Sequence, residues 1–165
     1  MRAVVLNRKI HRWAAIATAL PVFVVVFSGA VLLMKKEVAW IQPATKKGVG
    51  HELALSFDEI LRIAMTVKAV GIYGWADVDR LDVRPGKGLV KVRARNHWEI
   101  QVDMKTGEIL QVAVRRSDLI ESIHDGSFFH EQVKFWVLFP TAIVLVGVWA
   151  TGVYLFFFPY VKKRG

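Results

Sequence analysis

An uncharged stretch of 22 residues, 13–34, constrains this chain more than any other feature of its sequence. At 1.5 Å per residue it would form a helix of about 33 Å, and the hydrocarbon core of a bilayer is about 30 Å thick. Basic residues border it closely, with Arg12 before it and Lys35 and Lys36 after it. The stretch is therefore predicted to be a first transmembrane helix at residues 13–34.

A second uncharged stretch, residues 135–160, predicts a second transmembrane helix near the end of the chain. Lys162, Lys163 and Arg164 follow it, and the one hundred residues between the two spans hold the acidic residues of the chain. A chain of 165 residues, 54% of them hydrophobic, has room for these two spans and one small folded unit. A multi-span transporter is excluded.

The first span is predicted to be a retained anchor, although a basic start and the small residues Ser28-Gly29-Ala30 resemble a secretory signal. The apolar region of a signal runs to about 7–15 residues, and this one is longer. Lysine and arginine in the short tails, residues 1–12 and 161–165, predict that both termini are cytoplasmic. The central domain then lies outside the cytoplasm, in a periplasm or its equivalent.

The absence of cysteine removes several chemistries together. Disulfides, thiolate metal sites, iron–sulfur clusters, cysteine nucleophiles and covalently attached c-type haem all require that residue. The net charge of +9 is carried in large part by residues that flank the membrane spans. Anionic lipid headgroups are the expected partner of these charges, and nucleic acid is not expected.

Between the spans, the pattern changes from irregular to helical. Residues 35–55 are rich in glycine and lysine and are predicted to be a linker off the membrane. Ser56-Phe57-Asp58-Glu59 matches a capping box, in which a serine and a glutamate three residues later begin a helix. Apolar residues at helical spacing follow, which predicts a helix over about 57–70, ended by Gly71.

From Asp77 onward the apolar residues recur at every second position, which is typical of half-buried strands. Four runs separated by turns show this alternation: residues 81–84, 90–95, 98–104 and 108–114. Residues 56–116 are therefore predicted to form an α+β domain, with one helix packed on about four antiparallel strands and the other sheet face solvated. Residues 117–134 are predicted to be a connector helix, broken near Asp125-Gly126, that leads to the second span.

The order of these segments resembles the PepSY-associated transmembrane family of bacteria. The similarity covers nearly the whole chain and is carried by residues 8–13 before the first span, Ser28-Gly29 within it, residues 103–110, residues 123–126 and residues 151–155. Larger members of that family have four spans, and some resemble haem-containing ferric-siderophore reductases. This chain has two spans, so the resemblance implies half of such an assembly.

Three histidines at the mouths of the spans are the candidate ligands for the haem b that the resemblance implies: His11, His124 and His130. Axial ligation needs imidazoles that face an apolar pocket between helices. His11 lies about 30 Å, one bilayer thickness, from the other two, so it cannot share an iron with them. A homodimer or another membrane subunit would supply the missing ligands. Alternatively, the histidines are ordinary interfacial anchors, while His51 and His97 are expected to be solvated.

The chain carries no Ser-His-Asp arrangement, HExxH motif, phosphate-binding glycine loop or dinucleotide fingerprint, so a self-contained hydrolase or kinase is not expected. Three hypotheses remain. The chain is a subunit that transfers electrons across the membrane through haem b, a non-enzymatic accessory subunit of a larger membrane complex, or a PepSY-type inhibitor or chaperone that binds a periplasmic protein through a strand edge.

Overall fold

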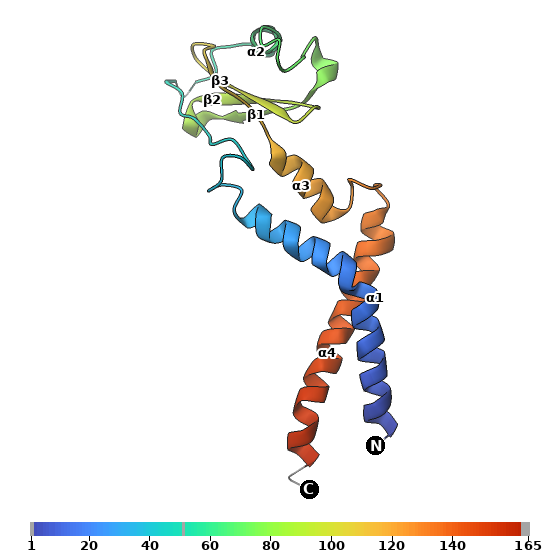
Figure 1. The fold of residues 1–165 in the computed structure, drawn as a ribbon. Coiled ribbons are helices and arrows are strands. Elements are labelled where there is room, and N and C mark those ends of the chain that lie inside the picture. The colour runs from blue at the N-terminus through green and yellow to red at the C-terminus, as the bar shows by residue number, and fades with distance from the viewer. Residues whose placement is uncertain (1, 51, 163–165) are drawn as a thin grey trace. The chain divides into compact units, whose positions relative to one another are not determined.

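A computed structural model describes residues 2–50 and 52–162, with side chains for 4–50 and 52–158. These residues form two compact units: a helical unit drawn from residues 2–31 and 120–162, and a sheet unit of residues 32–119. Figure 1 shows the elements in chain order. The elements are α1 (Arg2–Leu33), α2 (Phe57–Met65), η1 (Trp75–Asp77), β1 (Val78–Arg84), η2 (Pro85–Lys87), β2 (Leu89–Ala94), β3 (Trp98–Asp103), β4 (Ile109–Val114), α3 (Arg116–Asp125), η3 (Lys134–Leu138) and α4 (Phe139–Lys162).

The helical unit contains two helices long and apolar enough to cross a membrane, at Val4–Leu33 and Lys134–Phe158. Their side chains are largely exposed within this single chain, as expected for surfaces that contact lipid. The predicted fold class of two membrane helices and a small α+β domain is therefore confirmed. Helix α1 begins before the predicted span and takes in the basic residues that precede it.

The connection from α3 to α4 is shaped by a glycine and a proline. Gly126 has a φ of 80°, a left-handed conformation that ends α3 where the sequence predicted a break. Pro140 has no N–H, so it cannot donate a hydrogen bond to the preceding helical turn. Just before it the chain forms the wider π turn η3, in which the Phe139 N–H donates to the Lys134 carbonyl. The π turn immediately precedes α4 in the chain.

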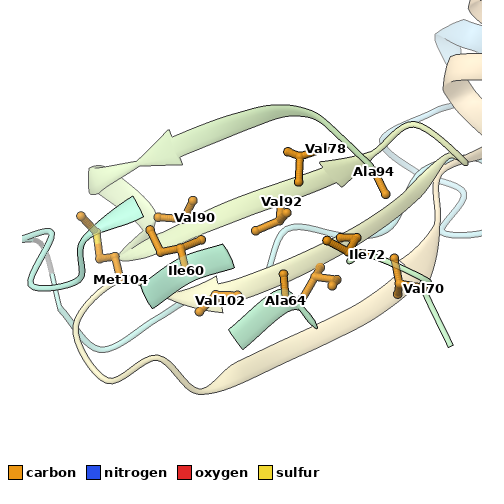
Figure 2. Close-up of a cluster of buried hydrophobic side chains, with 11 residues drawn as sticks. Ile60, Ala64, Val70, Ile72, Val78, Val90, Val92, Ala94, Val102 and Met104 are labelled. Atoms are coloured by element: carbon orange, nitrogen blue, oxygen red, sulfur yellow. The ribbon is translucent and has the colours of Figure 1, made fainter. Parts of the chain in front are cut away.

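The sheet unit is an antiparallel sheet with strands in the order β1-β2-β3-β4. Val90, Val92 and Val102 point from the central strands toward α2, where they pack with Ile60 (Figure 2). Ile100 belongs to the same buried core. The registers pair Val92 with Ile100 and Ile100 with Val112, so one face of the sheet carries the alternating apolar residues. This face is the predicted hydrophobic core.

Helix α2 begins as predicted and ends earlier than predicted. The Ser56 hydroxyl and the Glu59 carboxylate form both bonds of the capping box. The helix stops at Met65, five residues before the predicted end, because the Thr66 hydroxyl donates to the Ile63 carbonyl and tighter i to i+3 turns follow. This early end lets Val70 and Ile72 enter the core, which a continued helix would not permit.

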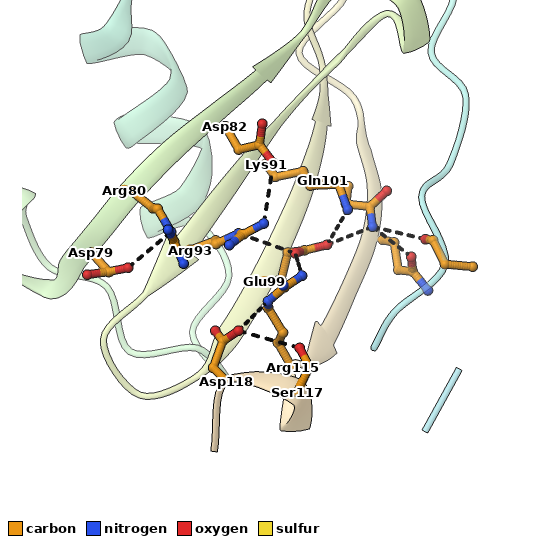
Figure 3. A network of polar contacts seen from close by, with 12 residues as sticks. Asp79, Arg80, Asp82, Lys91, Arg93, Glu99, Gln101, Arg115, Ser117 and Asp118 are labelled. Atoms are coloured by element: carbon orange, nitrogen blue, oxygen red, sulfur yellow. Dashed lines mark hydrogen bonds and ion pairs between the residues drawn. The ribbon is translucent and has the colours of Figure 1, made fainter. Parts of the chain in front are cut away.

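The second face of the sheet is buried over the central strands β2 and β3, so the prediction of a solvated face is wrong there. Lys91, Glu99, Gln101 and Asp103 are each at most 1% exposed, and Arg93 is 8% exposed. The register places Arg93 opposite Glu99 and Lys91 opposite Gln101, so the polar side chains of β2 and β3 lie beside one another. Lys91, Arg93, Glu99 and Gln101 belong to one network of hydrogen bonds and ion pairs (Figure 3).

Glu99 is the centre of this network. Its carboxylate accepts from Lys91 Nζ at 2.9 Å and from Arg115 Nη1 at 3.3 Å, and Arg93 Nε lies 3.7 Å away. The Gln101 amide also donates to Glu99, at 2.9 Å. Burial lowers the pKa of the Lys91 ammonium, and the hydrogen bond that the ammonium donates to Glu99 opposes this shift only in part. The alternating charges of the sequence are therefore paired in the protein interior.

The segment predicted to be a linker covers this polar face. The Lys46 N–H donates to Gln101 Oε1 at 2.8 Å, and Gln101 Nε2 donates to the Ala44 carbonyl at 3.0 Å. The Val49 N–H donates to Asp103 Oδ2 at 2.6 Å. Burial raises the pKa of the Asp103 carboxyl, but N–H donors from the Val49, Thr106 and Lys105 backbone outweigh burial and hold that pKa below its usual value.

Candidate functional site

His124, near the end of α3, makes two contacts with α1 through one nitrogen of its ring. Nδ1 lies 3.1 Å from the Val25 carbonyl oxygen and 3.0 Å from Ser28 Oγ. The carbonyl can only accept, and the Ser28 hydroxyl already donates to the Val24 carbonyl at 2.6 Å. The proton of this hydrogen bond therefore belongs to Nδ1, which leaves a lone pair on Nε2 of the neutral ring.

His11, in α1, repeats this arrangement on α4. Its Nδ1 lies 2.9 Å from Thr151 Oγ1. The Thr151 hydroxyl is placed to donate back to the Gly147 and Val148 carbonyls of its own helix, each at 2.9 Å. Thr151 then acts as the acceptor, and Nδ1 of His11 as the donor. Among the described residues, neither histidine makes a hydrogen bond through Nε2.

A glycine next to each hydroxyl makes room for the histidine ring. A Cβ at Gly29 would lie 3.2 Å from His124 Cε1, and a Cβ at Gly152 would lie 3.4 Å from His11 Cε1. Each span thus carries a hydroxyl–glycine pair that receives a histidine from the facing segment. In the sequence, Ser28-Gly29 and residues 151–155 stood out through the family resemblance, and their role as histidine partners was not predicted. The recurrence of the pair Ser28-Gly29 as Thr151-Gly152 is the signal that was available.

The two histidine sites lie at opposite ends of the helical unit. His11 and Ser28 are 17 residues apart on the same helix, about 25 Å at 1.5 Å per residue. The structure therefore brings His11 to Thr151 and His124 to Ser28, and does not bring the two histidines together. This separation agrees with the expectation that they cannot hold one iron.

His130 differs from the other two candidates. It is exposed, and its Nδ1 accepts a hydrogen bond from the Gln132 N–H at 3.1 Å. A neutral ring in that state carries its proton on Nε2, which is the opposite tautomer. His97 is exposed in the β2–β3 turn with a φ of 68°, as expected for a turn residue. His51 lies outside the described residues.

An apolar cavity of about 410 Å³ lies beside His124, within the size range of small-molecule sites. It is lined mainly by aliphatic residues of α1 and α4, such as Val22, Val26 and Leu145. Asp125 and Lys134 lie at its border. Hydrogen bonds from Ser127, first from its hydroxyl and then from its N–H, lower the pKa of the Asp125 carboxyl below its usual value, so this charge is retained at neutral pH.

The Nδ1 hydrogen bonds are one feature of an axial histidine ligand. A histidine that binds a metal through Nε2 normally donates its Nδ1–H to an oxygen, which holds the ring in position and raises the basicity of Nε2. His124 and His11 both have this arrangement. Among the residues that the structure describes, no three His, Asp or Glu side chains gather as a metal site, so each histidine would act as a single ligand from this chain.

Comparison with protein families identifies the chain. The family described as the PepSY-associated TM region matches residues 8–165. The chain belongs to the PepSY-associated transmembrane family. No curated protein and no solved structure matches it.

Family membership confirms the resemblance seen in the sequence, and with the two apolar helices it makes this chain a membrane protein in contact with the lipid bilayer. The matched region includes both membrane helices, the sheet unit and both hydroxyl–glycine pairs. The histidine sites therefore lie within the part of the chain that defines the family.

Proposed function

We propose that this PepSY-associated protein is a subunit of a bacterial inner-membrane complex that transfers electrons across the membrane through haem b. The observation that carries the proposal is the state of His11 and His124, each with Nδ1 committed to a hydroxyl on the facing helix and with Nε2 unbonded. Haem b would supply a one-electron carrier at each site. The chain's own part is to orient the two imidazoles and to surround them with apolar helices.

The proposal requires a second polypeptide, because the chain offers one such imidazole at each end. In a two-fold homodimer with its axis along the membrane normal, the two copies of His11 lie at one depth and the two copies of His124 at another. Each pair could then hold one haem. A different membrane subunit could supply the same ligands.

The proposed orientation places both termini in the cytoplasm and the sheet unit in the periplasm. The support is the basic character of the α1 N-terminal segment, which includes Arg8, Lys9 and Arg12, all of them before the uncharged stretch. His11 would then lie at the cytoplasmic side and His124 at the periplasmic side. Electrons would pass between the two compartments.

The full chain, extracted from its native membrane in mild detergent, is expected to show sharp b-type bands in a dithionite-reduced minus air-oxidised spectrum. His124→Ala and His11→Ala should each remove about half of the absorbance, and the double variant should remove all of it, since each histidine serves a separate haem. His130→Ala is the matched control and should leave the bands unchanged. A colourless wild-type preparation with its native partners retained contradicts the proposal.

Thr151→Val is expected to weaken haem retention at the His11 site by about tenfold or more, because Thr151 is the hydrogen-bond partner of Nδ1. Thr18→Val is the matched control. The Thr18 hydroxyl also donates to a carbonyl of its own helix, Ala14, but contacts no histidine. Haem content after dilution, measured from the absorption bands, compares the two. Equal retention in both variants would show that the Thr151 contact has no part in ligation.

A non-enzymatic accessory role is the second candidate. It is favoured by the large apolar side chains of α4 and η3 that this chain leaves exposed, such as Trp136 and Trp149, at 76% and 70%. Such faces suit packing on a larger membrane complex as well as lipid. A flat spectrum together with a stable co-purifying membrane subunit would favour this role.

A further inference from the structure

We propose that β4 is a homodimerisation edge, along which the sheet units of two copies of this chain pair antiparallel into one continuous sheet. The proposal concerns the sheet unit alone and does not depend on haem. It starts from the sheet order, which leaves two strands at the edges, β1 and β4.

The two edges are built differently. Each edge strand has a register irregularity, between Val78 and Arg80 in β1 and at Leu110 in β4. β1 is further protected, as natural edge strands usually are, by four charged residues in a seven-residue strand. β4, with the sequence ILQVAV, carries no charge from Ile109 to Val114. An uncharged β-branched edge is a template for another strand. In the native protein it is expected to be covered.

The backbone of β4 is available for pairing. The Arg115 N–H donates to the His97 carbonyl at 2.7 Å, so Arg115 points its backbone groups toward β3. Backbone groups alternate along a strand, so those of Val114 and Val112 point away from β3. In the described part of the chain, the backbone of β4 bonds to β3 and to no other segment.

A second copy suits this edge, because β4 has no charged side chain that would meet its own counterpart across a two-fold axis. Two copies related by a two-fold axis at Val112 place Val112 opposite its own counterpart and Gln111 opposite Ala113. This register keeps Val112, which pairs with Ile100 of the core, on the core face of both sheets.

Membrane attachment favours this partner further. The sheet unit is continuous at both ends with membrane helices, so copies of it are confined to one membrane surface. Confinement to one surface raises the effective concentration at which the β4 edge of one copy meets the β4 edge of another, without any new contact. A partner that diffuses in solution has no such advantage.

Cysteine cross-linking tests the proposal in the full chain, which has no cysteine of its own. Directly opposed residues of an antiparallel pair have Cα atoms about 4.5–5.5 Å apart, within reach of a disulfide. Val112→Cys, oxidised in native membranes, is expected to shift most of the chain to twice its mass of 18.7 kDa on a non-reducing gel. Val83→Cys is the matched control, because Val83 lies on the other edge strand opposite Val90 of the core, and it should stay monomeric.

A second cross-link tests the register of the proposed pairing. It also keeps the proposal testable if Val112→Cys does not react. In the proposed pairing, Gln111 of one copy lies opposite Ala113 of the other. Co-expressed Gln111→Cys and Ala113→Cys chains should cross-link to each other, and neither should cross-link efficiently alone.

Three results would overturn the proposal. The first is an absence of cross-linking at Val112 and in the Gln111 and Ala113 mixture, in variants whose sheet amides retain wild-type protection from hydrogen exchange. The second is equal cross-linking of Val83→Cys and Val112→Cys, which would indicate random collision. The third is a Val112→Cys adduct with a different protein, which would assign the edge to a hetero-partner.

Discussion

Glu99→Gln is expected to destabilise the sheet unit by about 3–5 kcal/mol, the usual cost of removing one member of a buried ion pair. Glu99 is fully buried and contacts three cationic side chains, those of Lys91, Arg93 and Arg115. Glutamine has nearly the same shape, so the variant removes the charge without opening a cavity. Arg93 and Arg115 retain Asp82 and Asp118, respectively, but Lys91 loses the carboxylate that it contacts.

Hydrogen exchange of the β2 and β3 amides in the detergent-solubilised full chain measures this loss. Asp79→Asn is the matched control, since it removes one carboxylate from the exposed Asp79–Arg80 pair, whose side chains are 52% and 57% exposed. An exposed pair contributes at most about 1 kcal/mol. Equal effects of the two variants would mean that the buried network contributes no more than a surface contact.

A second substitution separates the charge from the packing. Adding Lys91→Met to Glu99→Gln removes the ammonium that the first change leaves unpaired, so part of the lost protection should return. If the double variant is less stable than Glu99→Gln, the cost arises from packing around Lys91 and not from its unpaired charge.

Gly48→Ala is expected to destabilise the sheet unit by about 3 kcal/mol, because it introduces a Cβ where the covering segment touches the sheet. That Cβ would lie 2.0 Å from the Gly88 carbonyl oxygen and 2.6 Å from Asp103 Oδ2. The Gly88 oxygen belongs to the backbone and cannot move as a side chain would. The segment must therefore shift, which breaks the Val49–Asp103 hydrogen bond and admits water to the polar face.

Gly86→Ala is the control for this variant, because nothing lies within 4 Å of a Cβ at Gly86 and its φ is not positive. Exchange of the Val49 amide reports the covering segment, and exchange of the β3 amides reports the sheet. Gly48→Ala should accelerate both, while Gly86→Ala should change neither. Unchanged exchange at Val49 in Gly48→Ala would show that the segment does not depend on this close approach.

Most of the fold could be predicted from the chain because its signals are local. The two uncharged stretches are each long enough to cross a bilayer. The capping box at Ser56 indicates the start of a helix through contacts between residues three positions apart. Alternation along β2 and β3 indicates the core face for the same reason. The end of α2 was predicted wrongly because it depends on the packing of Val70 and Ile72 into the core, which is a tertiary contact.

The candidate site was predictable only in part. Position at the mouth of a span singled out His11 and His124 among five histidines, but that criterion gave His130 equal weight. Hydrogen-bond partners distinguish them, and those partners lie 140 residues away for His11 and 96 residues away for His124. A tautomer depends on which oxygen faces a ring, and sequence spacing carries no information about that contact.

The sequence by itself determined the two spans, the family, the strands and the apolar face of the sheet, because each of these depends on the period or length of a local pattern. Only the tertiary structure decided which polar residues are buried. The alternation of Lys91, Arg93, Glu99 and Gln101 is typical of a solvated face, yet the segment around Ala44 and Lys46 covers these residues. Burial of that face depends on a contact between segments more than fifty residues apart, which no local pattern encodes.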